Sequence, residues 1–192
     1  MFIETRPTPN PATVKFLPGR AVSPEGTLEF ADPDAAAEAS PLAAALLAIE
    51  GVATVFLGRD FISVTRSGDA DWAALKPEVL SVLVDHFLAD RPVLLETAKA
   101  HASDAQADQE GTAQDSETVR QIKAVLEEKV RPAVARDGGD IVFHSYEDGV
   151  VHLLMQGACS GCPSATFTLK QGIENLLRYY VPEVREVRPV EP

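Results

Sequence analysis

The organisation of this chain follows from one stretch, MQGACSGCPS at residues 155–164, which contains both of its cysteines, Cys159 and Cys162. The stretch stands between an apolar run and an amphipathic one, and is predicted to join a strand to a helix. Two thiolates at C-x-x-C spacing can face one soft metal centre or react with each other. Two thiolates are nevertheless too few to close a four-ligand metal site. A metal site here would need ligands from elsewhere.

The composition of the chain excludes several classes of partner. The 192 residues carry a net charge of −12, from 29 acidic and 17 basic residues, and no block of Lys or Arg interrupts that excess. Nucleic acids and anionic membranes attract basic surfaces, so we expect neither as a partner. No apolar run approaches the roughly 18 residues of a membrane span. Two cysteines are too few for the disulfide framework of a secreted protein. We therefore expect the protein to reside in a reducing cytoplasm.

A polar segment divides the chain. Residues 96–116 contain no Leu, Ile, Val, Phe, Trp or Tyr, so they cannot bury enough apolar surface to offset the entropy lost on ordering. We therefore predict two small α+β domains, residues 1–95 and 116–192, joined by a flexible linker over residues 96–115.

The N-terminal domain contains no cysteine. It is predicted to alternate short strands with helices. Residues 21–34 are interpreted as a loop that includes one short strand. The expected elements are strands at 2–5, 12–17 and 27–30, a helix from Ser40-Pro41 to Gly51, a hairpin of 52–57 with 61–65, and a helix over 72–89.

The C-terminal domain is predicted to place the cysteine stretch between its second strand and its last helix. Ser116 is the expected N-cap of the first helix. The expected elements are a helix from Ser116 through Val130, a short helical turn from Arg131-Pro132, a hairpin of 141–146 with 150–155, a helix over 163–180 and a strand at 184–190.

Four interpretations of the cysteine stretch follow from the residues alone. A strand, C-x-x-C and a helix N-terminus are the local arrangement of a thioredoxin site, but no βαβ unit precedes Cys159 and only about 30 residues follow it. A G-x-C-x-G nucleophile elbow requires a later histidine, and the last one is His152. Two buried filler cysteines would not need the glycines and proline of a tight, exposed loop.

The fourth interpretation is a metal site that two copies of the chain share. A two-fold interface places identical loops against each other, and four thiolates suit either Zn or an iron–sulfur cluster. Such a site would lie open at an interface and would release its contents readily, which favours a carrier over an enzyme.

Two other groups of residues were considered as ligands. His144 and His152 lie in opposed predicted strands and could complete a Cys/His zinc site, although histidines on a hairpin are more often solvated. The run Asp137-Gly138-Gly139-Asp140 could form a cation loop, but a helix that stops before a strand needs the same glycines.

Longer motifs resemble one known family. The stretch from Leu154 to Lys170, closing with Ile173-Glu174, resembles the C-terminal domain of the NifU family, and Arg131-Pro132 and the run 137–140 fit the same pattern. The N-terminal half resembles the Nfu N-terminal domain. The motifs that carry this second resemblance are Thr8-Pro9-Asn10-Pro11, Lys15-Phe16, Ser40-Pro41-Leu42 and residues 51–61.

The resemblance implies an iron–sulfur cluster scaffold or carrier that is not an enzyme. In such a protein, Cys159 and Cys162 of each of two subunits would hold one [4Fe–4S] cluster per homodimer, with a [2Fe–2S] form as a second candidate. Implied partners are upstream assembly machinery and recipient apoproteins. Since no leader precedes the N-terminal domain, a bacterial cytoplasmic location is expected. The alternative function is a thioredoxin-like redox protein that uses the same cysteines.

Overall fold

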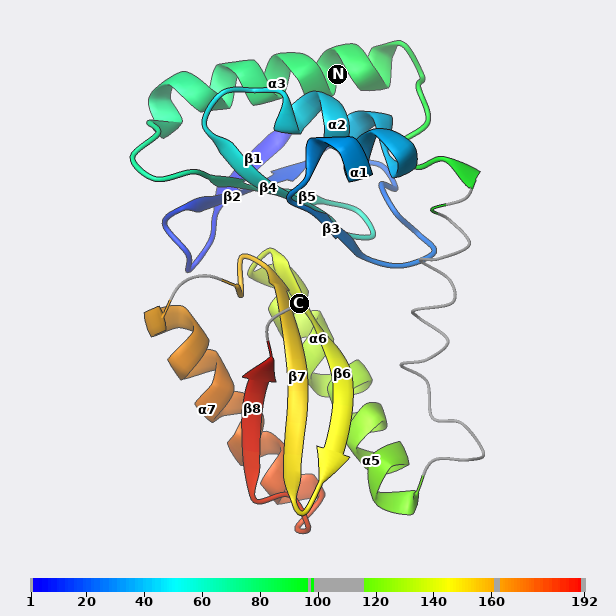
Figure 1. Ribbon diagram of the computed structural model, residues 1–192, viewed down its shortest axis with the longest axis vertical. Coiled ribbons are helices and arrows are strands. Elements are labelled where there is room, and N and C mark those ends of the chain that lie inside the picture. The colour runs from blue at the N-terminus through cyan, green and yellow to red at the C-terminus, as the bar shows by residue number, and fades with distance from the viewer. Residues whose placement is uncertain (1, 97, 99–115, 161–162, 191–192) are drawn as a thin grey trace.

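The computed structural model describes residues 2–96, 98, 116–160 and 163–190, which form two α+β domains with separate sheets and separate apolar cores (Figure 1). The predicted fold class is thus confirmed. Of the predicted linker, only Glu96 and Ala98 are described, and Ala98 is buried in the N-terminal core; the remainder lies outside the described residues. None of the described helices is long and apolar enough to cross a membrane.

The N-terminal domain is an antiparallel sheet with strand order β1-β2-β5-β4-β3. Its strands are β1 (Glu4–Pro7), β2 (Thr13–Leu17), β3 (Leu28–Phe30), β4 (Val52–Leu57) and β5 (Ile62–Arg66). Helices α1 (Pro33–Ala39), α2 (Pro41–Leu47) and α3 (Trp72–Leu88) lie on one face of the sheet, and the other face looks toward the C-terminal domain (Figure 1).

Strand alternation explains which side chains form the N-terminal core. Successive side chains of a strand point to opposite faces, so every second residue can meet the helices. The core-facing members of the three central strands are apolar and almost fully buried: Val14, Phe16, Val55, Leu57, Ile62 and Val64. The predicted hairpin of β4 and β5 is confirmed by their antiparallel register.

Helix α1 differs from the sequence prediction, which places a loop over residues 21–34 and begins the first helix at Ser40. The Asp32 side chain caps the helix by accepting from the Asp34 N–H, and Pro33 occupies the first turn. Ser40 then ends α1 and begins α2, since its Oγ accepts from the Ala43 N–H at 3.0 Å. The predicted N-cap role of Ser40 is confirmed, but two short helices meet there.

The C-terminal domain is a three-stranded sheet of order β6-β7-β8. Its elements are helix α5 (Glu117–Val125), a π-helical turn η1 (Leu126–Val130), α6 (Arg131–Arg136), β6 (Gly139–Glu147), β7 (Val150–Gly157), α7 (Pro163–Tyr180) and β8 (Glu186–Val190). Strands β6 and β7 are antiparallel, and β8 joins β7 in parallel after the crossover through α7. Ser116 caps α5 as predicted, by accepting from the Val119 N–H.

Two local features set the register of the C-terminal sheet. Asp148 and Gly149 both have positive φ, at 51° and 86°, which makes the two-residue hairpin turn that matches the twist of the flanking strands. A bulge between Phe143 and Ser145 displaces His144 from the ladder. Strand β7 then alternates buried with partly exposed residues along its whole length, so one of its faces packs on the helices.

We expect Leu153→Ala to destabilise the C-terminal domain by about 2–5 kcal/mol, because Leu153 is fully buried in the central strand and its truncation leaves a cavity. Leu154→Ala is the matched control, since Leu154 is partly exposed on the opposite face. Urea unfolding followed by far-ultraviolet circular dichroism measures the loss. The fluorescence of Trp72, the single tryptophan, reports on the N-terminal domain and should not shift. Equal losses for the two variants would contradict this assignment of faces.

Candidate functional site

Cys159 lies in a tight turn that follows β7. The turn is held by its own backbone: Cys159 N–H donates to the Gln156 carbonyl at 3.4 Å and Ser160 N–H to the Gly157 carbonyl at 3.1 Å. Gly157 has φ of +64°, a region that favours glycine. The strand–turn–helix placement of Cys159 is thus as predicted, while Cys162 lies outside the described residues.

The glycine run beside this turn is part of the site. Helix α6 ends at Arg136, and Gly138, with φ of +85°, directs the chain into β6. The interpretation of residues 137–140 as a helix stop therefore agrees with the structure. A Cβ at Gly139 would lie 2.6 Å from the Cys159 Sγ, so only glycine allows the two segments to approach this closely. The Gly138 carbonyl also accepts from the Ala158 N–H at 3.2 Å.

Cys159 is buried, which differs from the exposed loop that its glycines suggested. The side chain packs in the C-terminal apolar core with 5% of its surface exposed. Burial, with smaller contributions from the nearby charges of Asp137, Asp140 and Glu29, raises the pKa of Cys159 to about 12. At neutral pH the group is therefore a thiol. A redox-active cysteine needs the opposite shift, so this environment does not favour the thioredoxin-like alternative.

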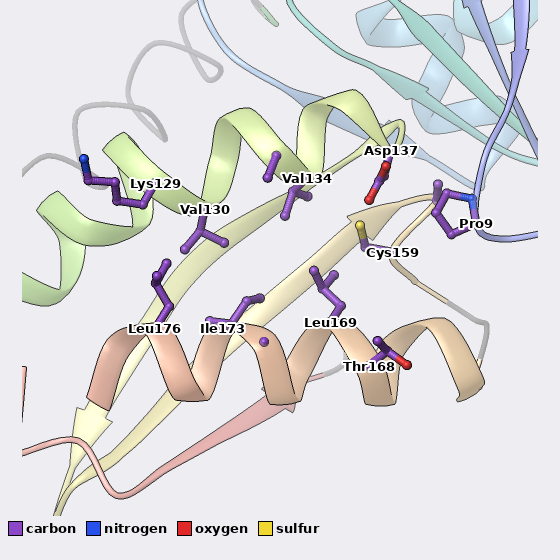
Figure 2. Close-up of a pocket in the computed structure, with 13 residues that line it drawn as sticks. Pro9, Lys129, Val130, Val134, Asp137, Cys159, Thr168, Leu169, Ile173 and Leu176 are labelled. Carbon is purple, nitrogen blue, oxygen red and sulfur yellow. The ribbon is translucent and has the colours of Figure 1, made fainter. Parts of the chain in front are cut away.

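An apolar cavity of about 590 Å³ leads to Cys159 between α7 and the helices η1 and α6 (Figure 2). Its walls are mostly aliphatic, with Val130 and Val134 on one side and Leu169 and Ile173 on the other. Pro9, from the N-terminal domain, lies at the end of the cavity beside Cys159 (Figure 2). The sulfur thus stands where the cavity meets the N-terminal domain.

Two side chains of the N-terminal domain hold the backbone of the cysteine turn. The Glu29 carboxylate accepts from the Gly157 N–H at 3.0 Å, and the Asn10 amide donates to the Ser160 carbonyl at 3.1 Å. Burial raises the pKa of Glu29 to about 6, against the opposing effect of the Gly157 hydrogen bond. Asn10 belongs to the quoted turn Thr8-Pro9-Asn10-Pro11, but Glu29 had no sequence signal that separated it from a solvated strand residue.

An ion pair fixes the base of β6. Arg131 donates to both carboxylate oxygens of Asp140, at 2.9 and 2.6 Å, and to Glu127 at 2.6 Å. Burial works against the Arg131 charge, but the hydrogen bonds with Asp140 and Glu127 outweigh it and raise the pKa of Arg131. Asp140 also accepts from the Thr27 hydroxyl at 2.7 Å. Asp140 is therefore occupied by these partners.

The structure does not place His144 and His152, the two possible zinc ligands, in a metal-binding cluster with described residues. His152 Nδ1 lies 3.1 Å from the Ser145 hydroxyl, and His144 sits in the bulge of β6. Within the described residues, no group of three or more His, Cys, Asp or Glu side chains could hold a metal ion.

Comparisons with known proteins agree with the two-domain arrangement. Residues 3–90 match the family model described as "Scaffold protein Nfu/NifU N terminal", and residues 122–188 match the "NifU-like domain". The chain belongs to the NifU/Nfu family. The expected resemblance is therefore confirmed in both halves.

Several NifU/Nfu relatives from fruit flies resemble nearly the whole chain. Proteins named "NFU1 iron-sulfur cluster scaffold homolog, mitochondrial" are 47% identical over 190 residues in Drosophila persimilis and 46% identical over 190 residues in Drosophila ananassae. These alignments cover 99% of this chain but only 65% and 64% of the two relatives. The chain thus spans somewhat less than two thirds of their length.

Solved structures of similar proteins correspond to single parts of this chain. The crystal structure of protein SAV1430 from Staphylococcus aureus is 29% identical, covers 43% of this chain and 99% of its own, and superposes with a TM-score of 0.37. The solution structure of a NifU-like protein from Saccharomyces cerevisiae is 24% identical, covers 50% of this chain and 86% of its own, and has a TM-score of 0.41.

The prediction of a bacterial cytoplasmic location is wrong. The fruit-fly relatives that match nearly the whole chain are named as mitochondrial proteins. That prediction rested on the absence of a leader before the N-terminal domain, and these relatives are longer than the chain. The position at which this sequence begins therefore carries no information about location.

We expect Glu29→Gln to remove a pH dependence of stability. Since burial raises the pKa of Glu29 from 4.5 to about 6, the folded chain binds this proton more tightly than the unfolded chain. The stability of the wild type should therefore fall, relative to the variant, as pH rises from 4.5 through 6, by about 2 kcal/mol at most. Urea unfolding followed by Trp72 fluorescence at pH 4.5 to 7 measures the difference.

Glu38→Gln is the matched control for this measurement, because Glu38 is exposed on α1. This variant should follow the wild type at every pH. If Glu29→Gln also followed the wild type, the Glu29 carboxyl would not be buried against Gly157 in solution.

Proposed function

We propose that this chain is an iron–sulfur cluster scaffold and carrier, and not an enzyme. In the proposal, Cys159 and Cys162 of two copies hold one [4Fe–4S] cluster as cargo. One observation carries this proposal. The chain has only two cysteines, in a C-x-x-C motif, and it matches family models described as a scaffold protein and a NifU-like domain. The names of the fruit-fly relatives, which call them iron-sulfur cluster scaffold homologs, support the same reading.

The number of ligands favours a shared site. One chain offers two thiolates, whereas an iron–sulfur cluster is held by four, and a two-fold axis between identical turns supplies the other pair. No described His, Asp or Glu cluster offers an alternative set of ligands. A [2Fe–2S] cluster would use the same four sulfurs and is the second candidate cargo.

Release follows from the same arrangement. Thiolates of a recipient apoprotein would replace the four cysteine sulfurs one at a time. Ligation needs deprotonated cysteine, so the affinity for the cluster should fall in acid. Upstream assembly proteins would load the site by the reverse exchange.

The two domains and the linker have separate roles in the proposal. Residues 116–192 would form the cluster-carrying domain and residues 96–115 a linker. Residues 1–95 would recognise recipient apoproteins, and the linker would keep the loaded domain at high effective concentration near them.

We expect Cys159→Ser and Cys162→Ser each to abolish stable cluster binding, because each substitution removes two of the four sulfurs in a symmetric pair. The measurement is anaerobic reconstitution, with iron and sulfide counted per dimer and the mass determined by light scattering. Ser160→Ala, in the same turn, is the control and should load as the wild type does. A dimer of either cysteine variant with a full complement of iron and sulfide would refute the shared site.

A further inference from the structure

The sheet of the N-terminal domain has a second buried face, opposite its helices. On β2, β3, β4 and β5, the residues that alternate with the core-facing ones include Lys15, Glu29, Phe56 and Ser63. Lys15, Phe56 and Ser63 are 7%, 1% and 1% exposed. Buried Lys and Ser side chains need hydrogen-bonding partners. We call these four residues, with Asn10 and Thr27 from the flanking loops, the docking face.

The partners of the docking face lie in the last turn of α6, in the glycine run that leads into β6, and in the turn that carries Cys159. Lys15 Nζ donates at 2.6 Å to the Ala135 carbonyl in the last turn of α6, where a cation also complements the helix dipole. The Ser63 hydroxyl donates at 2.6 Å to the Gly138 carbonyl. With the Glu29 and Asn10 contacts to Gly157 and Ser160, these bonds hold the glycine run and the cysteine turn at several points.

The fit between the docking face and the glycines is close. A Cβ at Gly138 would lie 2.9 Å from the Ser63 Oγ, and a Cβ at Gly157 would lie 3.0 Å from the Phe56 ring. Both glycines also have positive φ. At these glycines the C-terminal domain therefore presents backbone groups to the N-terminal sheet, and side chains of the sheet form hydrogen bonds with them.

The N-terminal domain contacts the backbone on both sides of Cys159. The N-terminal domain holds Gly157 and Ser160, on either side of the cysteine, and Pro9 lies at the cavity end next to it (Figure 2). Cys159 is 5% exposed in this arrangement. If two copies share a cluster, the sulfur of each Cys159 must face the other chain. A side chain buried as in this arrangement does not face a second chain.

We infer that the docking face is a built-in partner of the cysteine-bearing turns, and that docking competes with cluster binding. The docked N-terminal domain must leave the cysteine turn before two such turns can meet around a cluster. This inference rests on the proposed function for its second half only, since the docking itself involves no cargo.

Thiol labelling tests the docking without any cluster. In a Cys162→Ser background Cys159 is the only thiol, and its rate of reaction with Ellman's reagent reports its exposure. Ser63→Arg places a large side chain against the Gly138 carbonyl and should raise this rate at least tenfold. Ser81→Arg, the same substitution on the exposed side of α3, should leave the rate unchanged. An unchanged rate for Ser63→Arg would overturn the docking.

A second variant guards against misfolding as the cause. Lys15→Glu places a negative charge at the carbonyl end of α6 and should also speed labelling, whereas Lys76→Glu on α3 should not. Trp72 fluorescence during urea unfolding must show that each N-terminal domain remains folded. Faster labelling only in variants that have lost the Trp72 transition would overturn the inference.

Cluster loading tests the competition. With both cysteines present, Ser63→Arg should acquire iron and sulfide at least several-fold faster than the wild type or Ser81→Arg under the same anaerobic conditions. Equal loading rates together with faster labelling would overturn the competition but leave the docking. No cluster in any variant would refute the proposed function, and the labelling result would still decide the docking.

Discussion

The close approach of two backbone segments at the end of the β6–β7 ladder determines the shape of the site. Gly139 and Gly157 face each other in the register, and a Cβ at Gly157 would lie 2.8 Å from the Gly138 carbonyl oxygen. Because neither position has room for a side chain, the turn after β7 can fold back and bring the Cys159 sulfur against Gly139. The burial of the sulfur and its raised pKa follow from that approach.

The buried thiol and the proposed carrier role place opposite demands on one residue. A scaffold needs a thiolate that a second chain can reach, whereas this structure holds Cys159 as a protonated side chain within an apolar core. The two states are reconciled if the turn moves when cargo arrives. The thiol would then be protected while the two domains are docked and exposed once they separate.

Much of the fold could be predicted from local patterns. Strand and helix periods located most of the elements, and the capping residues Ser40 and Ser116 marked helix starts correctly. The cysteine motif identified the candidate ligand in the described turn. Helix α1 was missed because its alanine-rich sequence has no apolar period to distinguish it from a loop.

The docking face could not be predicted for a different reason. Glu29 and Lys15 alternate with core residues, and a charged residue in that position normally indicates a solvated face of the sheet. Only the packing of a second domain on that face buries them, and no local pattern records such a contact. The same limit applies to Cys159, whose glycines indicate a tight turn but do not reveal what covers it.

The nature of the contacts between the domains affects how the sequence can vary. Lys15, Ser63, Glu29 and Asn10 all bind carbonyl or amide groups of the C-terminal domain, and these groups are the same whatever side chain the residue carries. Substitutions at Ala135 or Ser160 would therefore preserve their backbone partners, while Gly138 and Gly157 have no room to change. Substitutions at positions such as Ala135 and Ser160 therefore do not disturb the neighbouring domain, whereas Gly138, Gly157 and Asp140, which accepts from Thr27, limit which sequences are compatible.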